Sequence, residues 1–219
     1  MSTWDTHPIG CGSCGASFEV PLLKGMHITR LPEVKASIRD GTFQVFRCPG
    51  CGAATEVDRP SVYTDFDAGH YVGVEPRRGG DRDEAKRRHR AVYDHAFLLG
   101  PAAASELATR TVHRVVFGHR ALREKVLAWD AGLDDVVVEL AKALAFGRRV
   151  DSAEVRLIGL LPPGEHLWFA VYAHGTHPPV DHRVVLRSEY EGCLARREEL
   201  RDAFPWVFDD WIVEASRGQ

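Results

Sequence analysis

The sequence predicts an α+β protein with a small N-terminal β domain and a larger C-terminal domain of helices and an antiparallel sheet. Three observations lead to this fold class. Two short cysteine turns, separated by residues 15–47, indicate a metal site in the N-terminal third. Two amphipathic helical segments follow in the middle of the chain, and residues 153–186 then alternate apolar and polar side chains as strands do.

Each cysteine turn has the form Cys-x-x-Cys-Gly, at residues 11–15 and 48–52. Two intervening residues allow one tight turn to aim both sulfur atoms at a single point. The glycine that follows can adopt a positive φ, so that backbone N–H groups turn toward the thiolates. Four thiolates from two such turns complete the tetrahedron of a structural zinc site. The sequence therefore predicts one structural Zn²⁺ per chain, bound by Cys11, Cys14, Cys48 and Cys51.

Disulfides or redox-active dithiols are the alternative use of these four cysteines. Zinc is favoured because both turns repeat one pattern and nothing indicates an oxidising compartment. Residues 1–10 lack the apolar core and basic segment of a secretory signal, and no run approaches the roughly 18 apolar residues of a membrane span. We therefore expect a cytoplasmic protein with no membrane contact. The remaining cysteine, Cys193, is expected to be a buried apolar residue.

The segments around the cysteine turns are predicted to form strands and one helix. Residues 17–23 alternate as a strand does, and 26–29 extend it. Residues 31–40 have a proline in the first turn and a glycine after the last, which predicts a short helix. A strand over 42–47 leads into the second turn, and 55–58 lead away from it. This is the plan of a zinc ribbon with a helical insertion, since each cysteine turn is the bend of a β-hairpin.

The rest of the chain is predicted to continue the N-terminal domain briefly and then form the second domain. Strands at 61–66 and 70–74 precede a stretch rich in glycine, proline and charge. The remaining elements are a helix at 85–99, a strand at 111–117, a helix hairpin from 121–130 and 135–144, strands at 153–161, 166–172 and 180–186, a helix at 188–201 and an aromatic tail at 204–211. The predicted domains are 1–76 and 85–219, with a linker at 77–84.

The two cysteine turns and the segment between them resemble the CpXC-domain proteins, a bacterial family. The resemblance covers most of residues 9–76, including Ile28-x-x-Leu31-Pro-Glu and Tyr63-x-Asp65-Phe-Asp, and continues through the helix hairpin up to Asp135. The first turn departs from the pattern, because Gly12 stands where the second turn has proline. The resemblance implies a metal site at the four cysteines of the two turns, and it implies no established reaction.

The charge distribution argues against a nucleic-acid-binding ribbon. Residues 1–75 carry 6 basic and 9 acidic side chains, residues 76–125 carry 12 and 6, and residues 126–219 carry 10 and 16. Phosphate binding needs a basic surface, and only the stretch 77–90 offers one. Its bases are interleaved with acids at helical spacing, which favours a solvated helix face.

Two further groups are candidates for chemistry in the C-terminal domain. The acidic cluster Asp130, Asp134, Asp135 and Glu139 is the most enzyme-like, with Glu124 or Lys125 expected across the helix hairpin. Hydrogen bonding at helix termini explains these acids as well as catalysis does. His174 and His177 have a spacing that permits a second metal, although the surrounding glycine and proline favour loop histidines.

These observations predict a non-catalytic zinc-binding protein that acts as a protein-interaction or assembly module. Three tryptophans near the termini are the expected contact points or, alternatively, core residues: Trp4, Trp206 and Trp211. A nucleic-acid-binding zinc ribbon and an enzyme with an unrecognised site in the C-terminal domain are the alternatives. The sequence contains no Gly-x-Ser-x-Gly, Walker or dinucleotide motif, and it does not determine the oligomeric state.

Overall fold

The computed structural model describes residues 3–77, 80–162, 165–173 and 178–216. The chain divides into two compact units, Met1–Leu122 and Arg123–Gln219, and each is described by itself. Helices and sheets occur in both units, which confirms the predicted α+β class. The predicted linker at 77–84 lies within the first unit, between its fourth and fifth sheet strands, and the division into domains stays a prediction.

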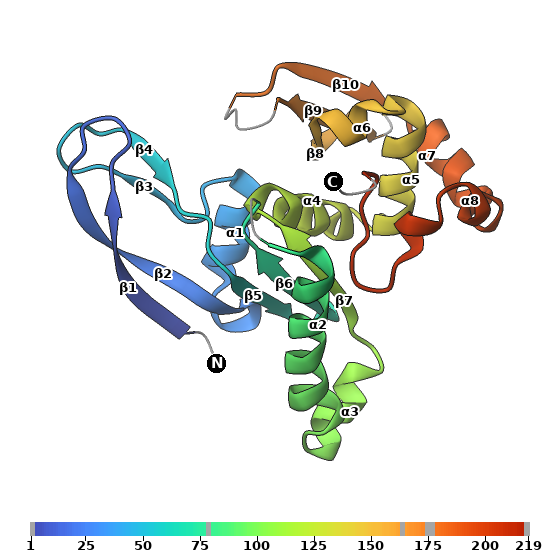
Figure 1. The fold of residues 1–219 in the computed structure, drawn as a ribbon. Helices are drawn as coiled ribbons and strands as arrows, with labels where there is room; N and C mark the ends of the chain where they lie inside the picture. The colour runs from blue at the N-terminus through green and yellow to red at the C-terminus, as the bar shows by residue number, and fades with distance from the viewer. Residues whose placement is uncertain (1–2, 78–79, 163–164, 174–177, 217–219) are drawn as a thin grey trace. The chain divides into compact units, whose positions relative to one another are not determined.

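The first unit is built on a mixed five-stranded sheet (Figure 1). Its strands, in spatial order, are β1 (Thr3–Gly10), β2 (Ser17–His27), β5 (Ser61–Asp65), β6 (His70–Glu75) and β7 (Val112–Phe117). The pairs β1–β2 and β5–β6 are antiparallel, whereas β2–β5 and β6–β7 are parallel. Strand β1 was not predicted, because its Trp-Asp-Thr-His-Pro sequence carries few of the apolar residues that mark a buried strand.

Helix α1 (Pro32–Asp40) lies where it was predicted, between the two cysteine turns. It buries Val34 and Ile38, which are one turn apart, and Gly41 ends it with a φ of 74° in the left-handed region. The predicted strand over 42–47 is shorter in the structure, where β3 covers only Val45–Arg47 and pairs with β4 (Ala54–Glu56).

The start of that predicted strand is replaced by a strained turn at Gln44, which has a φ of 52°. Its side chain is buried, and Oε1 accepts a hydrogen bond from Leu23 N at 3.2 Å. Its Nε2 lies 3.4 Å from Nε2 of the buried His119. These side-chain interactions stabilise the positive φ of Gln44, which is incompatible with a β-strand.

Helix α2 (Arg82–Tyr93) packs on β6 through an unusually close approach. A Cβ placed on Gly73 would overlap Nδ1 of His89, so glycine is the residue that fits there. The predicted single helix at 85–99 is wrong in its last turn: the α-helix ends at Tyr93, and η2 (Asp94–Leu98) continues as π-helix. A short helix, α3 (Ala102–Ala108), follows before β7.

The second unit packs helices on a three-stranded antiparallel sheet of spatial order β10-β9-β8. Its elements are the C-terminal part of α4 (His119–Asp130), α5 (Asp135–Phe146), α6 (Arg149–Ser152), β8 (Glu154–Leu161), β9 (His166–Tyr172), β10 (Asp181–Val185), α7 (Arg187–Ala195), α8 (Arg197–Ala203) and η3 (Pro205–Phe208). The predicted helix at 188–201 is interrupted at Arg196, which separates α7 from α8.

The α4–α5 hairpin is present where the sequence predicts it, and local contacts close its turn. Gly132 has a φ of 67°, and Leu133 N donates to Ala128 O at 2.9 Å, which closes the end of α4. Asp134 caps α5, because its Oδ1 accepts from the N–H groups of Val136 and Val137. The apolar side of this hairpin joins β8, β9 and the C-terminal residues in one buried core.

The three tryptophans near the termini differ in exposure. Trp4 on β1 is 56% exposed, whereas Trp211 is buried. Trp206 packs against the core of the second unit and donates its indole N–H to Ala215 O at 3.0 Å. Across the residues that the structure describes, none of the helices has the length and apolar character needed to cross a membrane.

Candidate metal centre

The two cysteine turns are the bends of the β1–β2 and β3–β4 hairpins, and they share one backbone pattern. In the first, Cys11 N donates to Ala16 O and Gly15 N donates to Cys11 O, both at 2.9 Å. The second repeats this with Cys48, Ala53 and Gly52, at 2.9 and 2.8 Å. Gly15 and Gly52 have φ values of 74° and 73°, so the positive φ that the sequence predicts is present in both turns.

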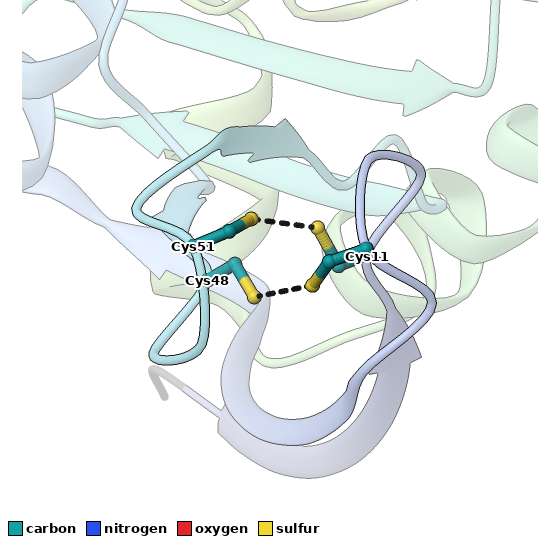
Figure 2. Close-up of side chains that lie close together, drawn as sticks. Cys11, Cys48 and Cys51 are labelled. Atoms are coloured by element: carbon teal, nitrogen blue, oxygen red, sulfur yellow. Dashed lines mark hydrogen bonds between the residues drawn. The ribbon is translucent and has the colours of Figure 1, made fainter.

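The four sulfur atoms of the turns lie within 4.8 Å of one another. Cys11 Sγ is 3.6 Å from Cys51 Sγ, and Cys14 Sγ is 3.6 Å from Cys48 Sγ. Figure 2 shows the sulfur atoms of one turn pointing toward those of the other. A zinc ion with about 2.3 Å bonds to four sulfur atoms places them about 3.8 Å apart, whereas a disulfide needs about 2.05 Å. The spacing therefore fits a shared metal ion and not disulfides between the turns.

Each turn supplies one buried and one exposed cysteine. Cys11 and Cys48 are buried, while Cys14 and Cys51 face solvent. The two hairpins share an apolar cluster made of Val20, Leu22 and Val57 with the partly buried Ile9, Phe18 and Phe46. An ion at the sulfur atoms would add a second link between the hairpins, beyond this apolar cluster.

Backbone amides at the first turn favour a thiolate. The N–H groups of Cys14 and Ser13 donate to the Cys11 sulfur and lower the pKa of Cys11 to about 6. For Cys51, the Ala53 amide lowers the pKa, but the neighbouring thiols of Cys14 and Cys11 outweigh it and raise the pKa to about 12. Within this cluster, ionisation of one thiol makes ionisation of its neighbours less favourable. A bound cation would offset this repulsion, because every ligand is then a thiolate.

Four thiolates leave a tetrahedral ion with no open coordination position. An ion held this way cannot bind a water or a substrate, so its contribution is to the fold. An all-sulfur tetrahedral set suits zinc and also iron. The four cysteines thus form a cluster able to hold a metal ion. Among the described residues, no other group of three or more histidine, cysteine or acidic side chains is close enough to do so.

The predicted acidic cluster is divided by the structure. Asp134 caps α5 through its Oδ1. Asp135 and Glu139 share one helix face, as predicted, and Lys125 lies against them, with Nζ 3.1 Å from Asp135 Oδ2 and 3.3 Å from Glu139 Oε1. Because these three side chains are almost fully buried, they are not placed to meet a substrate.

A larger buried network surrounds these residues, and the sequence analysis missed most of it. Lys142 lies 2.6 Å from Glu124 and 2.8 Å from Glu139, and Arg156 lies 3.4 Å from Glu214. The signal that would have found it is the occurrence of Glu139 and Lys142 within the otherwise apolar sequence of α5. Charges on the buried side of a helix are rare unless they are paired.

The remaining candidates have ordinary surroundings. Cys193 is buried, as expected. His174 and His177 lie outside the described residues. His166 accepts a hydrogen bond from Arg187 N at 3.2 Å through Nδ1, and His182 stacks on Trp168 with ring centroids 5.4 Å apart.

Comparison with known protein families supports the resemblance noted in the sequence. The family described as CpXC protein matches residues 9–142, which is more than half of the chain and includes both cysteine turns and the α4–α5 hairpin up to Lys142. Comparison with curated proteins and with solved structures found no match. On the extent of the family match, this chain belongs to the CpXC protein family.

Proposed function

We propose that this protein is a cytoplasmic, non-catalytic zinc protein that acts as a protein-interaction or assembly module. The observation that carries the proposal is the closed set of four sulfur atoms, since it leaves no coordination position for chemistry. One Zn²⁺ per chain, bound by Cys11, Cys14, Cys48 and Cys51, would join the β1–β2 hairpin to the β3–β4 hairpin. Metal binding of this type contributes on the order of 10 kcal/mol to folding.

Exposed apolar side chains in the first unit support a role in binding protein. Leu99 is 79% exposed, Leu98 54% and Val92 51%, and all three lie at or near the π-helical end of α2. Trp4 on the edge strand β1 adds a fourth. Large apolar side chains that stay exposed on a folded chain are candidate contact points for another protein. Trp211, which the sequence offered as a contact point or a core residue, is buried and is therefore a core residue.

The basic run of α2 supports the choice of protein over nucleic acid. Arg88 is paired with the buried Glu75 at 2.7 Å, and Arg90 lies 3.6 Å from Asp94. His89 is buried against β6 and therefore adds no charge to the exposed face of the helix. The pairing of Arg88 and Arg90 within the chain reduces the charge that this helix offers for the release of counterions that drives phosphate binding.

Elemental analysis of the full chain, purified without added metal, tests the zinc assignment. We expect one zinc per chain in the wild type and loss of the metal in Cys48→Ser and in Cys51→Ser. Cys193→Ser is the matched control, because that cysteine is buried outside the cluster and its loss should leave the zinc in place. Iron in place of zinc, two metals per chain, or no metal would contradict the assignment.

The interaction role is tested by comparing proteins retained from a bacterial lysate on the wild type, Leu99→Ser and Leu144→Ser. Both leucines are more than half exposed, but Leu144 lies in the second unit and serves as the control. We expect specific proteins that bind the wild type and Leu144→Ser and are lost with Leu99→Ser. The same retained set on all three chains would show that Leu99, at the end of η2, is not part of the contact surface.

A further inference from the structure

Two buried Glu–Lys pairs on the α4–α5 hairpin hydrogen-bond the backbone of two extended segments. One segment is β8, at Val155 and Leu157, and the other is the C-terminal segment Ile212–Ala215, which is buried but has no regular secondary structure. In Figure 1 this segment follows η3 near the red end of the chain. In both segments these charges contact backbone groups, and at β8 Glu124 also contacts the Arg156 side chain at 3.5 Å.

The geometry of the two sites is the same. At β8, Lys142 Nζ donates to Val155 O at 3.2 Å and Glu124 accepts from Leu157 N. At the C-terminal segment, Lys125 Nζ donates to Val213 O and Glu139 Oε2 accepts from Ala215 N, both at 2.8 Å. Each lysine therefore binds the carbonyl of one residue, and each glutamate binds the N–H two residues later.

This spacing is the one that an extended strand presents along a single edge. In a strand, the C=O of one residue and the N–H of the residue two places on point to the same side, where a neighbouring strand would bond them. Because β9 occupies the other side of β8, Glu124 and Lys142 satisfy the free edge of the sheet. Lys125 and Glu139 offer the same two partners to a second strand.

The four charges hold one another in place independently of the C-terminal segment. Lys142 bridges Glu124 and Glu139, and Lys125 contacts both Glu139 and Asp135. All five side chains come from α4 and α5, and all are almost fully buried. The second backbone site is thus already formed by the helix hairpin, which favours binding because little ordering remains to be done.

We propose that Lys125 and Glu139 form a binding site for an extended peptide backbone, and that the C-terminal segment is its ligand, bound within the chain and replaceable by the same peptide added separately. Both charged residues lie inside the matched region 9–142, whereas the segment lies far outside it. The segment also carries its own local structure, since Asp209 Oδ1 accepts from the N–H groups of Trp211 and Ile212.

A nicked protein tests this while every residue of the chain is retained. A protease recognition sequence is inserted between Ala203 and Phe204, where the exposed end of α8 precedes the segment. After cleavage, the fragment 204–219 is exchanged for a fluorescent synthetic peptide of the same sequence. Affinity is measured by anisotropy. The bond to Glu139 is probed with a peptide in which an ester replaces the amide of Ala215, because this change removes the N–H and keeps every side chain.

We expect the fragment to stay bound after cleavage, to exchange with the labelled peptide, and to bind about tenfold to a hundredfold more weakly with the ester at Ala215. The matched control is an ester at Val207, whose N–H bonds within the fragment to Phe204 O at 3.0 Å. That change should weaken binding less. A fragment that never exchanges or cannot rebind, or an ester at Ala215 that binds as well as the amide, would overturn the proposal.

A variant of the protein gives the complementary measurement. Glu139→Gln keeps the side-chain shape and replaces the carboxylate by a neutral amide, so the penalty of the Ala215 ester should shrink toward that of the Val207 ester. Glu191→Gln, on the exposed face of α7, is the control and should leave the penalty unchanged. The ester comparison on the unmodified protein decides the question even if Glu139→Gln fails to fold. An unchanged penalty in a folded Glu139→Gln would overturn the assignment of Glu139.

Discussion

At the scale of single residues, His89 and Gly73 form a contact on which the packing of α2 depends. His89 Nε2 lies 2.7 Å from Oε1 of the buried Glu75, and the imidazole ring rests directly on the Gly73 backbone. A side chain at position 73 would occupy the space of the ring. Sequence inspection gives no sign of this, because a glycine within a strand does not reveal which partner approaches it.

Gly73→Ala is predicted to destabilise the first unit by about 1–3 kcal/mol, since the new methyl group would overlap the His89 ring. Urea unfolding followed by circular dichroism measures the change. Gly192→Ala is the control, because nothing lies within 4 Å of a Cβ at Gly192, in helix α7. Combining Gly73→Ala with His89→Ala should recover part of the loss. A stable Gly73→Ala would mean that the ring moves aside without cost.

His89 also predicts a dependence of stability on pH. Burial lowers the pKa of His89 below its usual 6.5 and outweighs the opposing effect of Glu75. In this pH range the unfolded chain therefore binds a proton that the folded chain does not. The free energy of unfolding should accordingly be highest above about pH 7 and fall as the pH drops through 6.5.

The measurement is the free energy of unfolding between pH 7.5 and about 5.5 for the wild type, His89→Gln and His182→Gln. His89→Gln should flatten the slope, whereas His182→Gln, which alters a histidine stacked on Trp168 at the sheet surface, should keep it. Equal slopes in all three proteins would show that His89 does not change its protonation on unfolding.

At the scale of elements, the helix hairpin shows what sequence patterns reveal and what they omit. The hairpin predicted at 121–130 and 135–144 is present, and its turn depends on the positive φ of Gly132 and the cap at Asp134, which are local requirements that few residue types meet. The π-helix after Tyr93 and the break at Arg196 were missed, since the apolar spacing continues through both. The roles of Lys142 and Arg156 depend on backbone and acidic groups distant in sequence, which no local pattern contains.

Asp134 allows the effect of its helix cap to be separated from the effect of its charge. Asp134→Ala is predicted to destabilise the second unit by about 1 kcal/mol, because Val136 and Val137 lose their hydrogen-bond acceptor. Asp134→Asn should stay close to the wild type, since asparagine caps a helix as well as aspartate does. Thermal unfolding measures both. Equal losses in the two variants would show that the charge, and not the cap, is what the hairpin requires.

At the scale of the whole molecule, the two units differ in what holds them together. The first unit contains all four cysteines of the cluster, and an apolar cluster joins its two cysteine hairpins. The second has an apolar core that joins α5, three strands and the C-terminal residues. The cysteine spacing predicted the first arrangement from sequence, whereas the buried charges of the second became evident only in the folded structure.

Metal removal is therefore predicted to unfold the cysteine hairpins and to leave the second unit folded. Four of the five tryptophans lie in residues 123–219, and Trp211 is buried there, so tryptophan fluorescence reports mainly on the second unit. A strong chelator should release the metal and abolish the dispersed amide NMR signals of β1 to β4, with little change in tryptophan emission. Addition of one equivalent of Zn²⁺ should restore the signals, and Cys48→Ser should show the unfolded hairpins without chelator. A single transition in which both probes change together would show that the units unfold as one, so that the metal stabilises the whole chain.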